Sequence, residues 1–296
     1  MRALIIYLVI SAVFIGCTPI LSVDASTQSV YHFSDTDKNI SLLDISETFG
    51  TYDGSFVLYD NNLDSWKIYD LEEATKRIPP ESTYKIYDAL LGLESGIITP
   101  EHSSMTWNGD AFPFPSWEAD QDLNSAMQNS VNWYFQAIDS QLGINRVQEF
   151  LNKIEYGNQT TSSNLDLYWS DFSLKISPLE QVTLLKKFNT NEFHLNFQNV
   201  FSVKNAIKIA STPNGNFYGK TGTGRVNGQD INGWFIGYVE TSDNSYYFAT
   251  NIQSDSNATG KKAFEITSDI LKNYIYGINK YERADSCYQF FLFILY

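Results

Sequence analysis

The chain has 296 residues, 43% of them hydrophobic and 15% aromatic, and its formal net charge at pH 7 is −14. This length and apolar content are sufficient for a large core in one domain or in two closely packed subdomains. Nucleic acid and anionic lipid surfaces both require clustered lysine and arginine. The sequence contains no basic run, so we expect no nucleic-acid partner and no binding to lipid headgroups.

The N-terminus has the order of a targeting segment. Arg2 precedes an apolar stretch over residues 3–15, and Gly16-Cys17 follows, as at the cleavage site of a bacterial lipoprotein. An uncleaved anchor over residues 3–21 is the alternative, although Pro19 interrupts it. Both interpretations predict an exported protein, held at the outer face of the cytoplasmic membrane by a lipid or an anchor, or else secreted.

The domain boundaries are predicted from changes in composition. Residues 1–17 are the signal or lipoprotein-type segment, and residues 18–45 are a polar linker. Residues 46–278 are predicted to form the folded domain. Residues 279–296 form an apolar tail that is too short to cross a membrane.

Cysteine and histidine residues give no sign of a disulfide or a metal centre. The two cysteines, Cys17 and Cys287, lie at opposite ends of the chain, so we expect no structural disulfide. His32, His102 and His194 have no cysteine or histidine partner at zinc spacing, so no metal site is predicted.

The first half of the folded region reads as a hairpin followed by helices. Alternating side chains over residues 55–59 and 65–69, with a turn between them, predict a β-hairpin. Apolar residues at helical spacing predict helices over residues 83–93, 123–142 and 147–154.

The second half opens with a capped helix and continues with strands. Ser177 has the features of an N-cap, with proline following, and predicts a helix to about residue 187. Residues 217–220, 233–240 and 246–252 are rich in strand-forming side chains, and residues 261–276 predict a closing helix. This order predicts an α+β fold in which an antiparallel sheet is built from both chain ends and a helical subdomain is inserted between them.

Three short motifs follow one another along the chain. They are Ser82-Thr83-Tyr84-Lys85, Ser130-Val131-Asn132 and Lys220-Thr221-Gly222-Thr223. Ser-x-x-Lys and Lys-Thr-Gly are each common by chance, but the three together describe a serine acyl-transfer site.

The first motif pairs a nucleophile with a base. Pro79-Pro80 before Ser82 and the apolar residues after it suggest that Ser82 opens a helix. The i, i+3 spacing then places Lys85 on the same face as Ser82. A serine hydroxyl becomes a good nucleophile when a neutral amine takes its proton, and a helix N-terminus favours the developing negative charge.

The third motif lies on a predicted strand. In the run from Gly219 to Gly224, consecutive backbone N–H groups can face a substrate carbonyl, and glycines permit the close approach that this requires. An ordinary bulge is the structural alternative. The spacing fits neither a dinucleotide-binding nor a Walker-type phosphate loop.

With these motifs the chain resembles the penicillin-recognising serine acyl-transferases, which include penicillin-binding proteins and serine β-lactamases. Within them it is most similar to the class D β-lactamases and to the penicillin-sensing domains of Gram-positive β-lactam sensor-transducers. The resemblance covers roughly residues 54–274. Further matching runs are Trp107-Asn108-Gly109, Tyr156-Gly157-Asn158, Tyr168-Trp169, Leu174-Lys175-Ile176-Ser177 and residues 232–238.

The resemblance implies a role for each motif residue. Ser82 would be the nucleophile that opens the β-lactam ring, Lys85 its base, and Ser130 the group that passes a proton to the lactam nitrogen. Lys220, with Thr221 and Thr223, would hold the substrate carboxylate, and Gly222 would belong to the same substrate-binding motif. The backbone N–H groups of Ser82 and Thr223 would form the oxyanion hole. Tyr156-Gly157-Asn158 would shape the site, although a tight turn is the simpler explanation.

The resemblance also implies a modified base. In class D relatives the lysine carries a carbamate formed with CO2, which requires a neutral amine, and no other cofactor is expected. Val131 and Trp169 are the apolar neighbours that would depress the pKa of Lys85, and the Trp169 indole N–H could hold the carbamate. Core packing is the alternative role of Trp169.

Two departures from the class D pattern concern turnover. Asn132 stands where these enzymes usually have a hydrophobic residue, and its amide could hydrogen-bond to Lys85 and destabilise a carbamate. The arginine that class D enzymes use for the substrate carboxylate has no clear counterpart; Lys261 and Lys262 are the nearest cations in the sequence to its expected place.

We therefore predict an exported, β-lactam-reactive serine protein that forms an acyl-enzyme at Ser82, similar to class D β-lactamases but slow in deacylation. The alternative is a non-hydrolytic antibiotic sensor, or a truncated sensor-transducer, since the chain has no His-Glu-x-x-His protease motif. A peptidoglycan transpeptidase or carboxypeptidase fits less well, because Trp169 and the Tyr-Gly-Asn run match the other branch.

Overall fold

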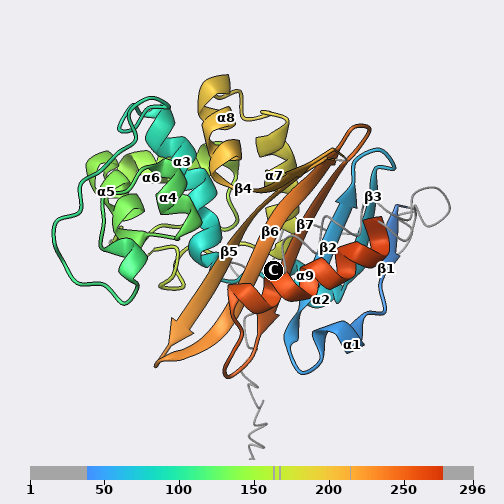
Figure 1. Ribbon diagram of the computed structural model, residues 1–296. Helices are drawn as coiled ribbons and strands as arrows, with labels where there is room; N and C mark the ends of the chain where they lie inside the picture. The colour runs from blue at the N-terminus through green and yellow to red at the C-terminus, as the bar shows by residue number, and fades with distance from the viewer. Residues whose placement is uncertain (1–38, 163, 167, 214, 276–296) are drawn as a thin grey trace, which may run out of the picture.

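The structure is a computed structural model that describes residues 39–275 except 163, 167 and 214. Within these residues, seven strands form one sheet in the order β1-β3-β2-β7-β6-β5-β4 (Figure 1). The strands are β1 (Ile40–Leu42), β2 (Asp53–Asp60), β3 (Ser65–Tyr69), β4 (Lys208–Thr212), β5 (Gly215–Val226), β6 (Gln229–Thr241) and β7 (Ser245–Gln253).

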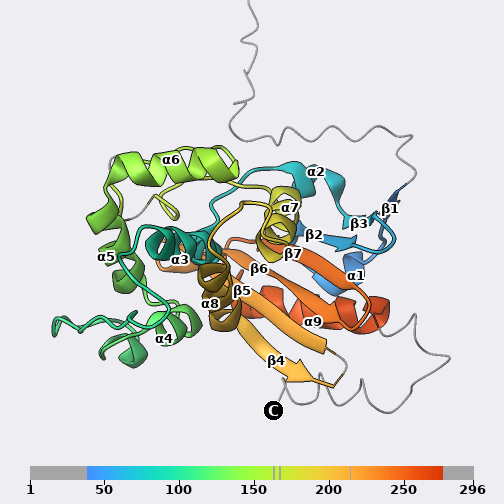
Figure 2. The same ribbon diagram turned by 90° about the horizontal axis from the view of Figure 1, so that it is seen from above.

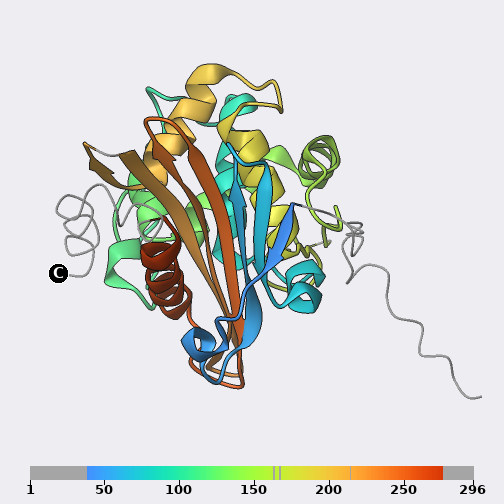
Figure 3. The ribbon, with the colours of Figure 1, turned by 90° about the vertical axis from the view of Figure 1, so that its right-hand side faces the viewer.

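Strands from both ends of the chain meet at the centre of the sheet. β2 pairs antiparallel with β7, so that Phe56 lies opposite Thr250. Figure 3 shows the blue β2–β3 hairpin beside the orange strands of the C-terminal half. The predicted hairpin and the predicted α+β fold are confirmed. The parallel pairing of the short strand β1 with β3 was not predicted.

Helices cover both faces of the sheet (Figure 2). They are α1 (Ser46–Phe49), α2 (Leu71–Thr75), α3 (Lys85–Glu94), α4 (Leu123–Gln128), α5 (Asn132–Leu142), α6 (Ile144–Ile154), α7 (Pro178–Asn189), α8 (Phe197–Ala206) and α9 (Gly260–Ile275), with 3-10 turns η2 (Glu81–Tyr84) and η3 (Pro115–Trp117). On one face, α9 packs on an aromatic cluster that includes Phe217, Phe235 and Phe248. On the other, α7 and the inserted helices bury the larger core.

Two helix predictions differ from the structure where the motifs lie. The single helix expected over residues 123–142 is two helices, because the chain turns at Ser130, whose φ is +53°. Ser82 does not begin the regular helix: it lies in the 3-10 turn η2, and α3 begins at Lys85.

The helix predicted from Ser177 is confirmed. The Ser177 side chain accepts a hydrogen bond from the Glu180 N–H, and the Glu180 carboxylate accepts one from the Ser177 N–H, which is a capping box. Helix α8 and strand β4 had no clear signal and were not predicted.

The targeting segment 1–17, most of the linker and the apolar tail 279–296 lie outside the described residues, so these predictions remain untested. No helix in the described part of the chain is both long enough and apolar enough to cross a membrane.

Candidate active site

Hydrogen bonds from side chains of the sheet fix the turn that carries Ser82. The Pro79 carbonyl accepts hydrogen bonds from the Asn232 side chain at 3.1 Å and from the Trp234 indole at 2.8 Å, both on β6. Glu81 follows in a left-handed conformation with φ +53°, which L-residues rarely adopt. These contacts fix the start of η2 and therefore the position of Ser82.

Lys85 lies beneath Ser82 and is fully buried. Its Nζ donates to Ser82 Oγ at 3.0 Å and to Asn132 Oδ1 at 2.7 Å. The same nitrogen lies 5.4 Å from the ring centre of Trp169 and 5.6 Å from that of Phe135. Burial lowers the pKa of Lys85 to about 8, because an ammonium loses its hydration there.

Three buried carboxyl groups lie near this lysine, and they oppose the lowering of its pKa by burial. They belong to Asp88 on α3, Glu81 on η2 and Asp139 on α5, and each favours the charged form of Lys85. Burial raises the pKa of Glu81 and of Asp139 to about 8 and that of Asp88 well above its usual range. These carboxyls were not predicted; a polar residue at a core position of a helix, such as Asp88, was the signal available.

Ser130 faces Ser82 from the turn between α4 and α5. The preceding helix holds this turn, since the Val131 N–H donates to the Ala126 carbonyl at 2.9 Å, and Val131 is fully buried. Nζ of Lys220 on β5 donates to Ser130 Oγ and, at 2.9 Å, to the Thr221 carbonyl. Burial, and secondarily the charge of Lys85, lowers the pKa of Lys220 well below its usual range.

Strand β5 closes the site from the other side. A Cβ on Gly222 would lie 3.2 Å from the Ser82 nitrogen and 3.1 Å from the Glu81 Cβ, so glycine permits the strand to approach the serine turn. Thr223 Oγ1 accepts a hydrogen bond of 2.8 Å from the Gly260 N–H at the start of α9.

These elements enclose a cavity of about 320 Å³. The predicted residues in its lining are Ser82, Ser130, Asn132, Thr221, Gly222 and Thr223, while Lys85, Lys220, Val131 and Trp169 lie behind it. The lining also contains Phe114, Ser116, Trp117, Asn129, Arg225 and Asp230, which were not predicted. For Arg225 a signal existed, because strand alternation places residues 221, 223 and 225 on one face.

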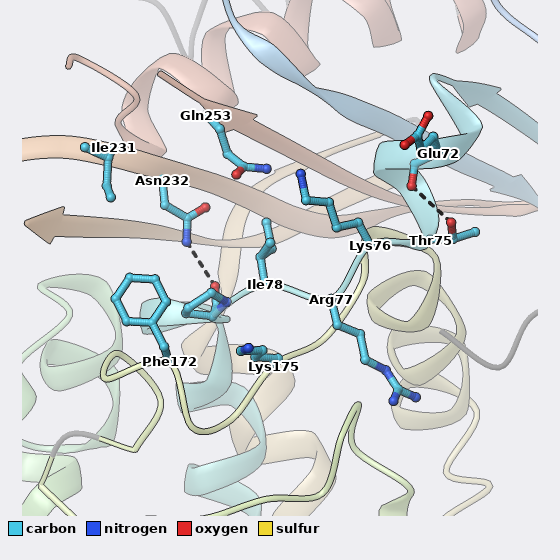
Figure 4. Close-up of a pocket in the computed structure, with 11 residues that line it drawn as sticks. Glu72, Thr75, Lys76, Arg77, Ile78, Phe172, Lys175, Ile231, Asn232 and Gln253 are labelled. Atoms are coloured by element: carbon cyan, nitrogen blue, oxygen red, sulfur yellow. Dashed lines mark hydrogen bonds between the residues drawn. The ribbon is translucent and has the colours of Figure 1, made fainter. Parts of the chain in front are cut away.

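A second pocket, of about 430 Å³, is lined by residues 75–79 together with side chains from β6 and β7 (Figure 4). Asn232 lines this pocket, and its side chain donates to the Pro79 carbonyl, as the dashed line shows. Lys76 and Arg77, which also line it, pair with Glu73 and Glu180. The pocket contains none of the predicted site residues.

The Tyr156-Gly157-Asn158 run forms a tight turn away from the cavity lining. Gly157 has φ +49°, and a Cβ there would lie 2.0 Å from the Lys175 carbonyl oxygen, so no other residue fits without displacement. The Asn158 side chain donates to the Ser173 carbonyl and accepts from the Lys175 N–H, which holds the loop that carries Trp169.

This topology is that of the penicillin-recognising proteins, as is a serine that is hydrogen-bonded to a buried lysine. The family model described as "Penicillin binding protein transpeptidase domain" matches residues 51–272, and the chain belongs to this family.

A regulatory protein and a solved penicillin-receptor domain are both similar to this chain. The chain is 45% identical over 271 residues to the "Regulatory protein BlaR1" of Bacillus licheniformis, across 91% of this chain and 44% of that protein. The solved "C-terminal domain of the Bacillus licheniformis BlaR penicillin-receptor" superposes with a TM-score of 0.78 at 45% identity, covering 82% of this chain and 98% of that domain. The chain thus spans less than half the length of this curated relative.

A class D enzyme is also similar. The solved "Class D beta-lactamase BAT-2" superposes with a TM-score of 0.73 at 37% identity, covering 78% of this chain and 95% of that chain. Sensor domains and class D β-lactamases therefore share this fold and a substantial part of the sequence.

Proposed function

We propose that this protein is acylated by β-lactam antibiotics at Ser82 and releases the acyl group slowly. The observation that carries the proposal is the 3.0 Å hydrogen bond between Lys85 Nζ and Ser82 Oγ. Because the pKa of Lys85 is about 8, a neutral amine forms near neutral pH and can take the serine proton. The serine oxygen then bonds to the lactam carbonyl carbon, and the ring C–N bond breaks.

Ser130 is proposed to protonate the leaving nitrogen. Its Oγ lies at the cavity surface and is hydrogen-bonded to Lys220. Ser130 gives its hydroxyl proton to the lactam nitrogen, and the proton that Lys85 took from Ser82 is then passed to the Ser130 oxygen, which restores its hydroxyl.

The strand β5 is proposed to stabilise the reacting carbonyl. Backbone N–H groups of Ser82 and Thr223 are the oxyanion donors in this proposal, and the close approach at Gly222 supports it. Thr221 and Thr223 line the cavity. The Thr223 hydroxyl accepts from Gly260, so its own hydrogen can be donated to a substrate carboxylate.

Slow release of the acyl group is expected because Lys85 is hydrogen-bonded to Asn132. Deacylation in the class D manner needs a carbamate on Lys85, and such a group would supply a base for the attacking water. Asn132 Oδ1 instead presents an acceptor 2.7 Å from Nζ, which stabilises a nitrogen that carries hydrogens and repels carbamate oxygens. The surroundings of Lys85 therefore do not favour the modified base.

The similar proteins support a receptor rather than a rapid hydrolase. The solved domain that is 45% identical carries the name of a penicillin receptor, and the curated relative that of a regulatory protein. A class D hydrolase is the second candidate, favoured by the buried Lys85 beside Trp169 and by the likeness to a class D enzyme. Export, by a lipoprotein-type or anchoring segment, is part of the proposal and follows from residues 1–17 alone.

The test follows both product release and covalent mass. The purified protein is mixed with a chromogenic cephalosporin, with and without bicarbonate, and its intact mass is recorded over time. We expect one equivalent of colour and a persistent adduct that Ser82→Ala abolishes. Continued release with bicarbonate would instead identify a hydrolase, and absence of any adduct on the unaltered protein would overturn the proposal.

A further inference from the structure

The carboxylate of a β-lactam needs a cationic partner that faces the cavity. Lys220, to which the sequence resemblance gives this role, has only 5% of its surface exposed. Its Nζ is directed to Ser130 Oγ and to the Thr221 carbonyl. The buried Lys220 is therefore placed to serve Ser130 and is poorly placed to attract an anion from solvent.

Arg225 is the single cation in the lining of the cavity that contains Ser82, within the described part of the chain. It lies on β5, two residues beyond Thr223, and the pairing with β6 shifts register between Gly224 and Arg225. Its side chain is 58% exposed, so its charge meets solvent at the mouth of the cavity.

Asp230 on β6 holds the guanidinium in one orientation. Arg225 Nε donates to Asp230 Oδ1 at 2.7 Å, and a terminal nitrogen donates to Oδ2 at 3.1 Å. These bonds use two of the five N–H donors of an arginine, and the fork-shaped group can bind a second carboxylate through others. Asp230 also lines the cavity, so the ion pair lies at the site itself.

The lysines suggested by the sequence are less well placed. Lys261 and Lys262 lie in the first turn of α9, and neither belongs to the cavity lining. Lys262 Nζ pairs with Glu265 at 2.8 Å.

We propose that Arg225 binds the carboxylate of the incoming β-lactam and that Asp230 is the residue that positions it. The inference rests on the proposed acylation of Ser82 and names the group that selects anionic substrates for it. Strand β5 then supplies the carboxylate-binding arginine, two residues after the substrate-binding motif.

The test compares benzylpenicillin with its uncharged methyl ester in the purified protein. The second-order rate constant of acylation is measured by intact mass for each compound. Arg225→Gln should lower the rate with benzylpenicillin by about fivefold, as expected for one charge-assisted contact at an exposed site, and leave the rate with the ester within about twofold. Arg225→Lys should recover only part of the loss, because lysine keeps the charge without the fork geometry.

Lys261→Gln and Lys262→Gln are the matched controls and should leave the ratio of the two rates unchanged. Asp230→Asn should reduce discrimination between the two compounds, and an unaltered melting temperature would exclude a folding defect. An unchanged ratio in Arg225→Gln, or a lowered ratio in Lys261→Gln, would overturn the inference while acylation of Ser82 still stood. Absence of any adduct on the unaltered protein would overturn the proposed function instead.

Discussion

The side-chain oxygen of Asn132 accepts a 2.7 Å hydrogen bond from Nζ of Lys85, the same nitrogen that reaches Ser82. The Lys85 amine therefore hydrogen-bonds both to the nucleophile and to the Asn132 amide at the N-terminus of α5. The amide supports the lysine as a hydrogen-bond donor, which serves acylation. In the proposed function, the same amide oxygen would repel the oxygens of a carbamate on Lys85.

Asn132→Val should speed the release of the acyl group. Valine removes the acceptor and leaves an apolar neighbour, so the amine is more readily neutral and can combine with CO2. We expect the deacylation rate with bicarbonate to rise by about tenfold or more, measured as decay of the mass adduct. Asn129→Ala is the control, because Asn129 lines the same cavity but donates to the Ser125 carbonyl. Equal deacylation rates in Asn132→Val and the unaltered protein would show that this hydrogen bond does not limit release.

Acylation should rise with pH and level off above about pH 8. The neutral form of Lys85 is the base, and its pKa is lowered to about 8 by burial, so the neutral fraction increases through this range. Below the pKa the rate should fall about tenfold for each pH unit. Stopped-flow measurement of the acylation rate between pH 5.5 and about 9 checks this, and a flat profile would exclude Lys85 as the titrating base.

Glu81→Gln should make the stability of the protein less dependent on pH. Burial raises the pKa of Glu81 from 4.5 to about 8, so the folded state holds a proton that the unfolded chain loses between these values. The unaltered protein therefore loses stability as the pH rises from 4.5 to 8, at up to about 1.4 kcal/mol per pH unit.

The glutamine variant keeps an uncharged side chain that can still accept from Asn232. Its free energy of unfolding relative to the unaltered protein, from urea denaturation, should increase between pH 5 and about pH 8 by at least about 1 kcal/mol. Glu101→Gln, at an exposed carboxylate, is the control. A difference that is constant with pH would contradict the assignment of a neutral, buried Glu81.

Gly222→Ala should impair acylation more than stability. The added Cβ would meet the Pro80 carbonyl and the Ser82 nitrogen at 3.2 Å, so β5 and the serine turn must move apart by a few tenths of an ångström. We expect a loss of about 1–2 kcal/mol in unfolding free energy and at least a tenfold lower acylation rate, since the oxyanion donors are displaced. Thermal melting and acylation by a chromogenic cephalosporin measure the two effects. An unchanged rate would show that the approach of β5 is not needed for the reaction.

Local patterns in the sequence were sufficient for much of the fold. The hairpin β2–β3, the N-cap at Ser177 and the helices α6, α7 and α9 follow from side-chain spacing and end signals over a few residues. The three motifs were likewise visible without a structure. The pairing of Lys85 with Ser82 follows from a spacing of three residues in a helical turn.

The break between α4 and α5 could not be predicted in this way. Apolar spacing continues through residues 123–142, and nothing local signals that Ser130 adopts a positive φ. Tertiary contacts hold it there: Lys220, 90 residues further along the chain, donates to its hydroxyl.

The sequence by itself determined the family resemblance, the order of the three motifs and the identity of the nucleophile and base proposed here. The contact of Asn132 with Lys85 was expected from the sequence and is present. Only the tertiary structure decided the other surroundings: the three buried carboxyls near Lys85, and Arg225 at the mouth of the cavity. The physical reason is distance along the chain. Helix caps and turns depend on neighbouring residues, whereas a pKa or a cavity depends on side chains from separate elements that packing brings together.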